Sequence, residues 1–218
     1  MTVGELAFWF FLVPLAVSAG TTPLIRGLAR RIGLLDHPDG ESYKWHDRAT
    51  PYLGGLPIIL ATSTIFVFGD LRGEAATKVQ AMFVAAILCS LVGLLDDWRR
   101  IGAGPKMLGV LCGGLIVWWA DVGTHLSSFT PLDLVLSLLW LAAITNAFNI
   151  IDNMDGVAAG VAGFASLSYF AVAVATDQPE FAMLTLSIAA ACFGFLRFNF
   201  RPATIFLGDF GTMYLGLI

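Results

Sequence analysis

The sequence predicts an all-α, polytopic integral membrane protein with seven transmembrane helices and the start of an eighth. First, 57% of the 218 residues are hydrophobic and only 13% are charged, whereas a soluble domain carries about 25% charged residues. Second, the charged residues cluster between long apolar runs. Third, lipid offers no hydrogen-bonding partner to the backbone, so each long run is expected to be a helix.

The expected spans follow one another along the whole chain. Gly and Pro inside them, such as Gly54, Gly55 and Pro57, are tolerated in membrane helices. The fourth span is shorter than the others, and the eighth begins in the last apolar stretch, Met213–Ile218. The first seven are Leu6–Ile25, Leu53–Gly69, Val79–Leu95, Met107–Ala120, Leu132–Ile151, Val157–Ala175 and Phe181–Phe198.

The basic residues predict the orientation of these spans. Ten of the 12 Lys and Arg residues lie in the first loop, in the third loop or after the seventh span, and only Arg72 and Lys78 lie elsewhere. Positively charged loops stay in the cytoplasm. We therefore expect a multi-pass membrane protein with its N-terminus outside and these basic loops in the cytoplasm.

Other classes of protein fit the composition poorly. A net charge of −4 gives no basic signature for a nucleic-acid partner. The three cysteines lie in apolar runs without metal-ligand spacing, so neither a disulfide framework nor a zinc site is expected. The N-terminus lacks the basic residue and small-residue cleavage site of a signal peptide, so cleavage is not expected.

Three polar motifs lie at the cytoplasmic ends of the spans. Asp96 and Asp97 end the third span and are expected either to flank a cation or phosphate or to form a solvated cap beside Arg99 and Arg100. These two interpretations are equally favoured by the motif alone.

The second motif recurs every third residue at the end of the fifth span. Asn146, Asn149, Asp152 and Asp155 follow one flank of the expected helix as far as Gly156, where a turn becomes easy. Magnesium takes oxygen ligands, so this row favours a site for magnesium and a polar ligand. Helix capping explains one or two such residues but not four.

The third motif places Asp209 between Gly208 and Gly211 at the start of the eighth span. We expect the glycines to let the backbone approach a ligand and Asp209 to act as a metal ligand, although Asp is also a favoured N-cap. In the first loop, Asp36, Lys44, His46 and Arg48 accompany stiffening prolines. Lys44 and Lys106 can contact phosphates, or they can serve only as topology signals.

Five carboxylates and several cations at a lipid boundary suit phosphoryl transfer. Such a reaction needs a metal to neutralise a diphosphate, cations for the remaining charge and little covalent chemistry from the protein. The acceptor natural to this position is a lipid phosphate. An ion-coupled transporter is the alternative from another class, but its carboxylates would lie near the middle of the spans.

With these motifs, the sequence resembles the polyprenyl-phosphate N-acetylhexosamine-1-phosphate transferases. The resemblance covers nearly the whole chain, and the motifs stand in the family's order. They are D-x-P…K-x-H…P-x-x-G-G in the first loop, the Asp96–Asp97 pair followed by Lys106, N-x-x-N-x-x-D-x-x-D-G, and N…P…F-x-G-D-x-G-[ST].

The resemblance implies a single transmembrane transferase domain over 1–218, incomplete at its C-terminus. It implies transfer of a sugar-1-phosphate from a UDP-N-acetylhexosamine to undecaprenyl phosphate, with release of UMP. The cofactor would be Mg²⁺, with Mn²⁺ as an alternative. The resemblance further implies a multi-pass protein of the bacterial inner (plasma) membrane with its active site on the cytoplasmic face. Membrane lipid would be a further partner, and a homodimer is possible within this family. We expect the 218 residues alone to be inactive and the parent protein to be active.

The resemblance also implies roles for individual residues. Asp209 and Asp152 would bind the metal, and either Asp96 or Asp97 would bind or deprotonate the lipid phosphate. Direct attack by that phosphate and a covalent enzyme intermediate both remain open. Phe206 is placed to stack on uracil. The full expected set is Asp96, Asp97, Asp152 and Asp155 for catalysis and Lys44, His46, Lys106, Asn146, Asn149, Asn199 and Phe206 for substrate.

Departures from the family pattern concern the donor sugar. Asn153 stands where a Gly is common, Tyr43 replaces a basic residue, and Thr212 replaces a common Ser. The first loop reads Thr-Pro-Tyr-Leu-Gly-Gly over 50–55, unlike the Thr-Pro-Thr-Met-Gly-Gly type of the phospho-MurNAc-pentapeptide translocases. We therefore expect GlcNAc as the donor sugar, with translocase-type activity as the alternative.

Overall fold

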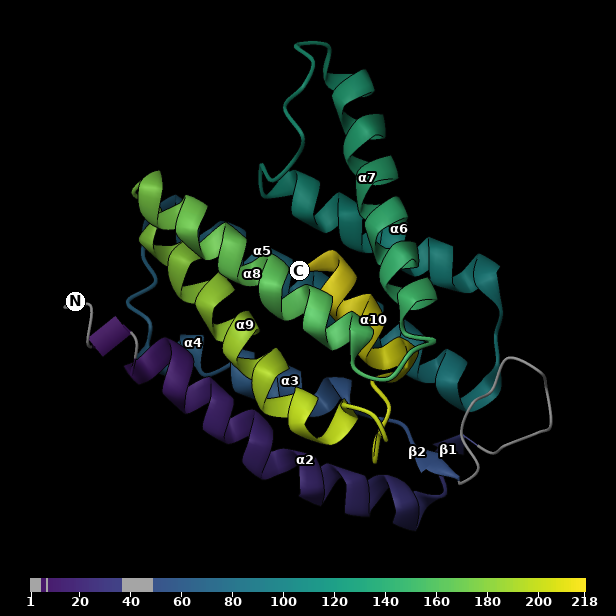
Figure 1. Cartoon of the computed structure of the whole chain (residues 1–218). Coiled ribbons are helices and arrows are strands. Elements are labelled where there is room, and N and C mark those ends of the chain that lie inside the picture. Colours follow the sequence, from purple (N-terminus) through teal and green to yellow (C-terminus); the bar gives the residue numbers. More distant parts are fainter. Residues whose placement is uncertain (1–4, 7, 37–48) are drawn as a thin grey trace.

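The computed structural model describes residues 5–6, 8–36 and 49–218, and nearly all secondary structure in these ranges is helical (Figure 1). A π-helical turn, η1, runs directly into the first long helix. The elements in order are η1 (Phe8–Leu12), α2 (Val13–Ile32), β1 (Leu35–Asp36), β2 (Thr50–Pro51), α3 (Gly55–Thr62), α4 (Ile65–Phe68), α5 (Gly73–Arg99), α6 (Ala103–Trp119), α7 (Thr130–Ile151), α8 (Val157–Ala175), α9 (Pro179–Asn199) and α10 (Gly208–Leu217).

The helices confirm an all-α membrane fold. Five apolar helices in the described residues are long enough to cross a bilayer, and two shorter apolar helices accompany them, Gly55–Phe68 and Ala103–Trp119. These seven helical segments correspond in order to the seven expected spans. Because the two short ones fall below the length of a full crossing, the number of spans stays a prediction.

The first two expected spans differ from the helices of the structure. The first helix continues past Ile25 to Ile32, and its last turn carries Arg30 and Arg31. Positively charged side chains are stabilising at this position because they lie at the negative end of the helix dipole. The second span is interrupted between α3 and α4. There the hydroxyls of Ser63 and Thr64 donate to the carbonyls of Leu60 and Ala61 and offer the backbone a local alternative to the helical ladder.

Helix α9 forms the centre of the bundle and packs between α2 and α8 (Figure 1). The approach of α2 is close because Gly194 lies against the Leu15 carbonyl, where a Cβ atom would come within 2.5 Å. The Ser18 hydroxyl donates to the Ala191 carbonyl at 2.7 Å. A small residue and an interhelical hydrogen bond thus hold the two helices together, as is usual in lipid.

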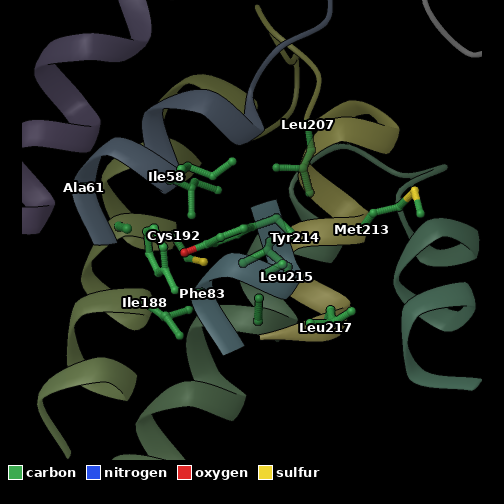
Figure 2. Packing of buried hydrophobic residues seen from close by; sticks show 14 of the residues in the cluster. Ile58, Ala61, Phe83, Ile188, Cys192, Leu207, Met213, Tyr214, Leu215 and Leu217 are labelled. Carbon is green, nitrogen blue, oxygen red and sulfur yellow. The ribbon is translucent and has the colours of Figure 1, made fainter. Parts of the chain in front are cut away.

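The short helix α10 lies inside the bundle against α3, α5 and α7. Figure 2 shows its Tyr214 in the core, with Phe83 of α5 and Cys192 of α9 beside the ring. The buried Tyr214 hydroxyl hydrogen-bonds Thr62 of α3 at 2.6 Å. Because α10 is surrounded by packed side chains, its first residues have a fixed position.

The helix ends of the expected cytoplasmic side lie together on one side of the bundle. They are the C-terminal ends of α2, α5, α7 and α9 and the N-terminal ends of α3, α6, α8 and α10, because consecutive helices run in opposite directions. Helices α6 and α7 project from the remaining helices as an arm (Figure 1). The three polar motifs of the sequence all fall on this shared side.

Candidate active site

A cavity of about 900 Å³ opens among these helix ends. Carboxylates dominate its wall, and two arginines and two aromatic rings complete it. Its lining residues come from the β1–β2 region, the end of α5, the end of α7 and the segment that leads into α10. They are Leu35, Asp36, Tyr52, Asp96, Asp97, Arg100, Asn149, Asp152, Asn153, Met154, Asp155, Arg201, Phe206, Gly208 and Asp209.

The Asp97 carboxylate caps the N-terminus of α10. The Oδ1 and Oδ2 atoms of Asp97 accept the backbone N–H groups of Asp209 and Phe210, each at 3.0 Å. The Asp152 carboxylate lies near the N–H of Gly208. These N–H groups have no partner within the helix, and negative charge is favoured at a helix N-terminus. Asp97 therefore fixes the position of Asp209.

Glycines bring the capped end of α10 against its neighbours. A Cβ atom on Gly93 of α5 would lie 2.4 Å from the Asp209 carbonyl oxygen. Gly208 has φ of +72°, which glycine adopts readily. We expected Gly211 to let the backbone approach a ligand, and this was wrong. Gly211 lies against Gly55 of α3, where it permits close helix packing instead.

Lys106 on α6 joins two of the predicted carboxylates. Its Nζ atom lies 2.9 Å from Asp96 Oδ2 and 2.6 Å from Asp209 Oδ2. The other oxygen of Asp96 accepts the backbone N–H of Gly102 at 2.9 Å. Lys106 thus places one positive charge between the ends of α5 and α10. The two predicted motifs and this lysine form one connected network.

Asn149 of α7 extends the network on its other side. Its side-chain amide donates to Oδ1 of Asp209 and, at 3.2 Å, to the Thr212 hydroxyl. Asp209 therefore has a partner on each of its oxygens, Lys106 on one and Asn149 on the other. This arrangement holds the Asp209 side chain in one orientation at the cavity wall.

The expected helical row from Asn146 to Asp155 is only half helical. Helix α7 ends at Ile151, and Asp152 and Asp155 lie in the turn that leads to Gly156, whose φ is +76°. This turn carries Asp155 to the segment between α9 and α10, where its Oδ2 accepts the Ala203 N–H at 2.9 Å. The continuous flank is corrected to a helix end followed by a turn.

Burial affects the titration of the groups in the loops. Desolvation raises the pKa of Asp152 well above its usual value, and the nearby Asp209, Asp97 and Asp155 carboxylates raise it further. A cation near Asp152 would offset this cost because it favours the charged form. Desolvation likewise raises the pKa of Tyr52, together with the Asp36 carboxylate that its hydroxyl hydrogen-bonds. The phenol therefore stays a hydrogen-bond donor.

Three predicted residues do not line the cavity. Lys106 is joined to its wall through Asp96 and Asp209. Asn146 is exposed on α7, and its amide donates to the Ala142 carbonyl of its own helix at 2.9 Å. Asn199 is buried, and its amide donates to the Ile205 carbonyl at 3.1 Å, so that it braces the segment before α10. Lys44 and His46 lie outside the described residues.

Other residues line the cavity although the sequence did not single them out as site residues. Tyr52, Arg100, Asn153, Met154 and Arg201 are among them. Arg100 and Arg201 had been interpreted as counter-charges or topology signals. Both arginines follow the ends of helices that border the predicted motifs, and this position could have indicated that they line the site. Tyr52 stands at an unspecified (x) position of the P-x-x-G-G motif, so the motif does not predict a role for its side chain.

The donors available to a metal are oxygens, as magnesium requires. Within residues 5–6, 8–36 and 49–218, however, no three Asp, Glu, His or Cys side chains converge on one point as a metal cage. Magnesium in phosphoryl-transfer sites is often held by one or two carboxylates with the remaining ligands from substrate phosphates and water. The cavity fits that second mode, with Asp209 and Asp152 on its wall.

Known proteins are similar in sequence to this chain. The profile described as glycosyl transferase family 4 matches residues 79–218, which include all the carboxylates above except Asp36. A probable undecaprenyl-phosphate N-acetylglucosaminyl 1-phosphate transferase of Bacillus subtilis (strain 168) is 31% identical over 94% of this chain and 59% of its own.

Phospho-N-acetylmuramoyl-pentapeptide-transferases are also similar. The Lactiplantibacillus plantarum protein is 30% identical over 86% of this chain and 65% of its own, and the Kineococcus radiotolerans protein is 30% identical over 93% and 72%. The chain thus spans about 60% of the length of the first two relatives. The family profile covers more than half of the chain, and the chain belongs to glycosyl transferase family 4.

Proposed function

We propose that the protein transfers GlcNAc-1-phosphate from UDP-GlcNAc to undecaprenyl phosphate and releases UMP. The observation that carries this proposal is the cavity at the helix ends, where the Asp97–Asp209–Lys106 network lies. A lipid phosphate anchored in the bilayer reaches such a cavity from the membrane side, and a water-soluble nucleotide sugar reaches it from the cytoplasm. The name of the Bacillus subtilis relative supports this donor and acceptor.

The hydrogen bonds and ion pairs made by the carboxylates favour direct attack by the lipid phosphate. Both oxygens of Asp96, Asp97 and Asp209 are engaged by N–H groups or by Lys106. A carboxylate held in this way is a poor nucleophile. In direct attack, an oxygen of undecaprenyl phosphate forms a bond to the β-phosphorus of the donor. The bond from that phosphorus to the bridging oxygen breaks, and UMP departs with the electron pair.

The residues around the cavity have separate tasks in this reaction. Asp209 and Asp152 would hold Mg²⁺, whose charge would neutralise the diphosphate when bound. Lys106 keeps Asp96 and Asp209 from repelling each other. Phe206, a half-buried ring of the cavity wall, would stack on uracil. The protein thus acts mainly by positioning and electrostatic stabilisation, as phosphoryl transfer requires.

Two alternative functions are compared with this proposal. Several relatives are named phospho-N-acetylmuramoyl-pentapeptide-transferases, which favours UDP-MurNAc-pentapeptide as the second candidate donor. An ion-coupled transporter fits less well, because Asp96 and Asp97 lie in the last turns of α5 and Asp209 in the first turn of α10. None of these carboxylates lies near the middle of its helix.

The test is an assay in membranes that contain the full-length parent protein, with undecaprenyl phosphate and labelled UDP-GlcNAc. We expect label in the lipid fraction, loss of transfer in chelator with recovery on added Mg²⁺, and little transfer by Asp209→Asn. Transfer that proceeds unchanged in chelator would refute the role of the metal. Label incorporated only from UDP-MurNAc-pentapeptide would assign the second donor.

A further inference from the structure

Tyr52 is a cavity residue to which no motif gives a role. It follows β2, lines the wall and is half-buried. Its backbone is fixed from two sides, because the Tyr52 N–H donates to the Leu34 carbonyl at 3.2 Å and the neighbouring Pro51 carbonyl accepts the Phe206 N–H at 2.9 Å. The strands and the segment before α10 therefore hold this residue in one place.

The residue after Tyr52 pays a conformational cost for this placement. Leu53 has a φ of +82° and is buried, and non-glycine residues rarely adopt that region. The turn at Leu53 brings Gly54 and Gly55 against α9 and α10, where Cβ atoms would come within 2.4 Å of Phe195 and Gly211. Backbone strain of this kind persists only where the surrounding structure over-determines it.

The Tyr52 ring borders both the aromatic and the acidic part of the cavity. Its centroid lies 6.4 Å from that of Phe206, and the planes meet at 49°. On the other side, a Cβ atom on Gly208 would lie 3.3 Å from the Tyr52 ring and 2.8 Å from Asp97. Tyr52 thus neighbours Phe206 and the Asp97-capped end of α10 at the same time.

The geometry of the ring pair excludes a sandwich. A flat base held between two rings needs parallel planes about 7 Å apart, twice the carbon–carbon contact distance. The tilted rings at 6.4 Å form a corner, so a base can stack on only one of them. The other ring faces the portion of the ligand that continues toward the carboxylates.

We propose that Tyr52 contacts the ribose and α-phosphate of the nucleotide donor, between a base on Phe206 and a diphosphate at Asp209. This inference rests on the proposed function. The ring offers an apolar surface to the ribose. The hydroxyl is held by Asp36, so the ring keeps its orientation when the ligand is absent. UMP contains the whole of the contacted portion and is therefore the probe.

The experiment measures UMP binding to the purified full-length parent protein by titration calorimetry. Tyr52→Leu keeps bulk beside Gly208 but removes the aromatic face, and we expect it to weaken UMP binding about tenfold, or roughly 1.4 kcal/mol. Tyr52→Phe is expected to restore binding to within about threefold. Tyr169→Leu is the matched control because Tyr169 is 62% exposed on α8 and does not line this cavity; it should leave binding unchanged.

A second measurement needs no variant. Hydroxyl-radical footprinting of the wild-type parent protein should show that UMP protects Tyr52 and leaves the oxidation of Tyr169 unaltered. UMP binding that is unaffected by Tyr52→Leu, together with no protection of Tyr52, would overturn this inference and leave the proposed function standing. A wild-type full-length parent protein that binds neither UMP nor UDP-GlcNAc would overturn both. Weakened binding of UDP-GlcNAc with unchanged binding of UMP would place Tyr52 at the sugar and overturn the ribose contact.

Discussion

The Asp97 carboxylate at the end of α5 accepts the backbone N–H of Asp209 at the start of α10, at 3.0 Å, and its second oxygen accepts the N–H of Phe210. Two residues 112 positions apart are joined by this cap. The cap holds the backbone from which the Asp209 side chain reaches Lys106 and Asn149. Asp97 therefore positions the acidic centre whatever else it contacts.

Removal of the cap should lower both stability and activity. We expect Asp97→Ala to reduce the free energy of unfolding by about 0.5–2 kcal/mol, the usual range for a lost N-cap. Asp97→Asn keeps one accepting oxygen and should fall between Ala and wild type. Thermal unfolding in detergent measures the effect. A variant Asp97→Ala as stable as wild type would show that α10 does not depend on this cap.

Gly93 tests the contact between α5 and α10. A methyl group there would lie 2.4 Å from the Asp209 carbonyl oxygen, so we expect Gly93→Ala to displace α10 and to cost roughly 1–3 kcal/mol. Gly160→Ala is the matched control, because nothing lies within 4 Å of its Cβ position in α8. That change should be neutral or stabilise the helix by up to about 1 kcal/mol. Equal unfolding temperatures for the two variants would contradict the packing described here.

Lys106 has a counterpart on the opposite side of the bundle. Lys78 also joins two carboxylates, Glu74 at 2.8 Å and Asp121 at 3.1 Å, and the two lysine side chains are similarly exposed, 21% and 24%. We expect Lys106→Met to reduce sugar-phosphate transfer at least about 100-fold, because two carboxylates then repel each other and the substrate diphosphate.

Lys78→Met changes the same residue type with the same number of ion pairs. Transfer by this variant should stay within about threefold of wild type, since exposed ion pairs contribute little. Initial rates of UMP release in membranes, at matched protein levels, compare the two. If both variants lose activity equally, Lys106 has no special part in the site.

Two substitutions distinguish a catalytic role of Asp155 from a positioning role. Its Oδ2 accepts the Ala203 N–H at 2.9 Å, and an amide oxygen can accept the same bond. We expect Asp155→Asn to retain at least about a third of the activity and Asp155→Ala to lose about tenfold, because the segment that carries Phe206 is released. Equal loss of kcat in both variants would instead assign Asp155 a charge-dependent catalytic role.

Sequence reasoning could predict which side chains share the site but not how they are held. Asp96, Asp97, Asn149, Asp152 and Asp209 come together because motif order and membrane topology place all of them at the same helix ends. The fifth span was predicted to end at Ile151, where α7 does end. The row from Asn146 to Asp155 was nevertheless interpreted as one helical flank, because a three-residue period is typical of a continuous helix and does not show the turn that follows Ile151.

Other features depended on tertiary contacts that spacing does not encode. The cap formed by Asp97, the packing of Gly211 on Gly55 and the inward position of Tyr52 each join segments far apart in the chain. Asn199 has the residue type of a ligand, but burial directs its amide to a neighbouring carbonyl. A polar residue in a motif can therefore serve the loop that carries the site.

The most direct test of the proposed function follows the β-phosphate of the donor. Membranes that contain the protein are given undecaprenyl phosphate, Mg²⁺ and UDP-GlcNAc labelled with ³²P at the β-phosphate and ³H in the sugar. Transfer of sugar-1-phosphate predicts that both labels enter the lipid in equal amounts and that unlabelled UMP is released in the same amount. Entry of ³H alone, with ³²P left in UDP, would show transfer of the sugar without its phosphate and would contradict the account.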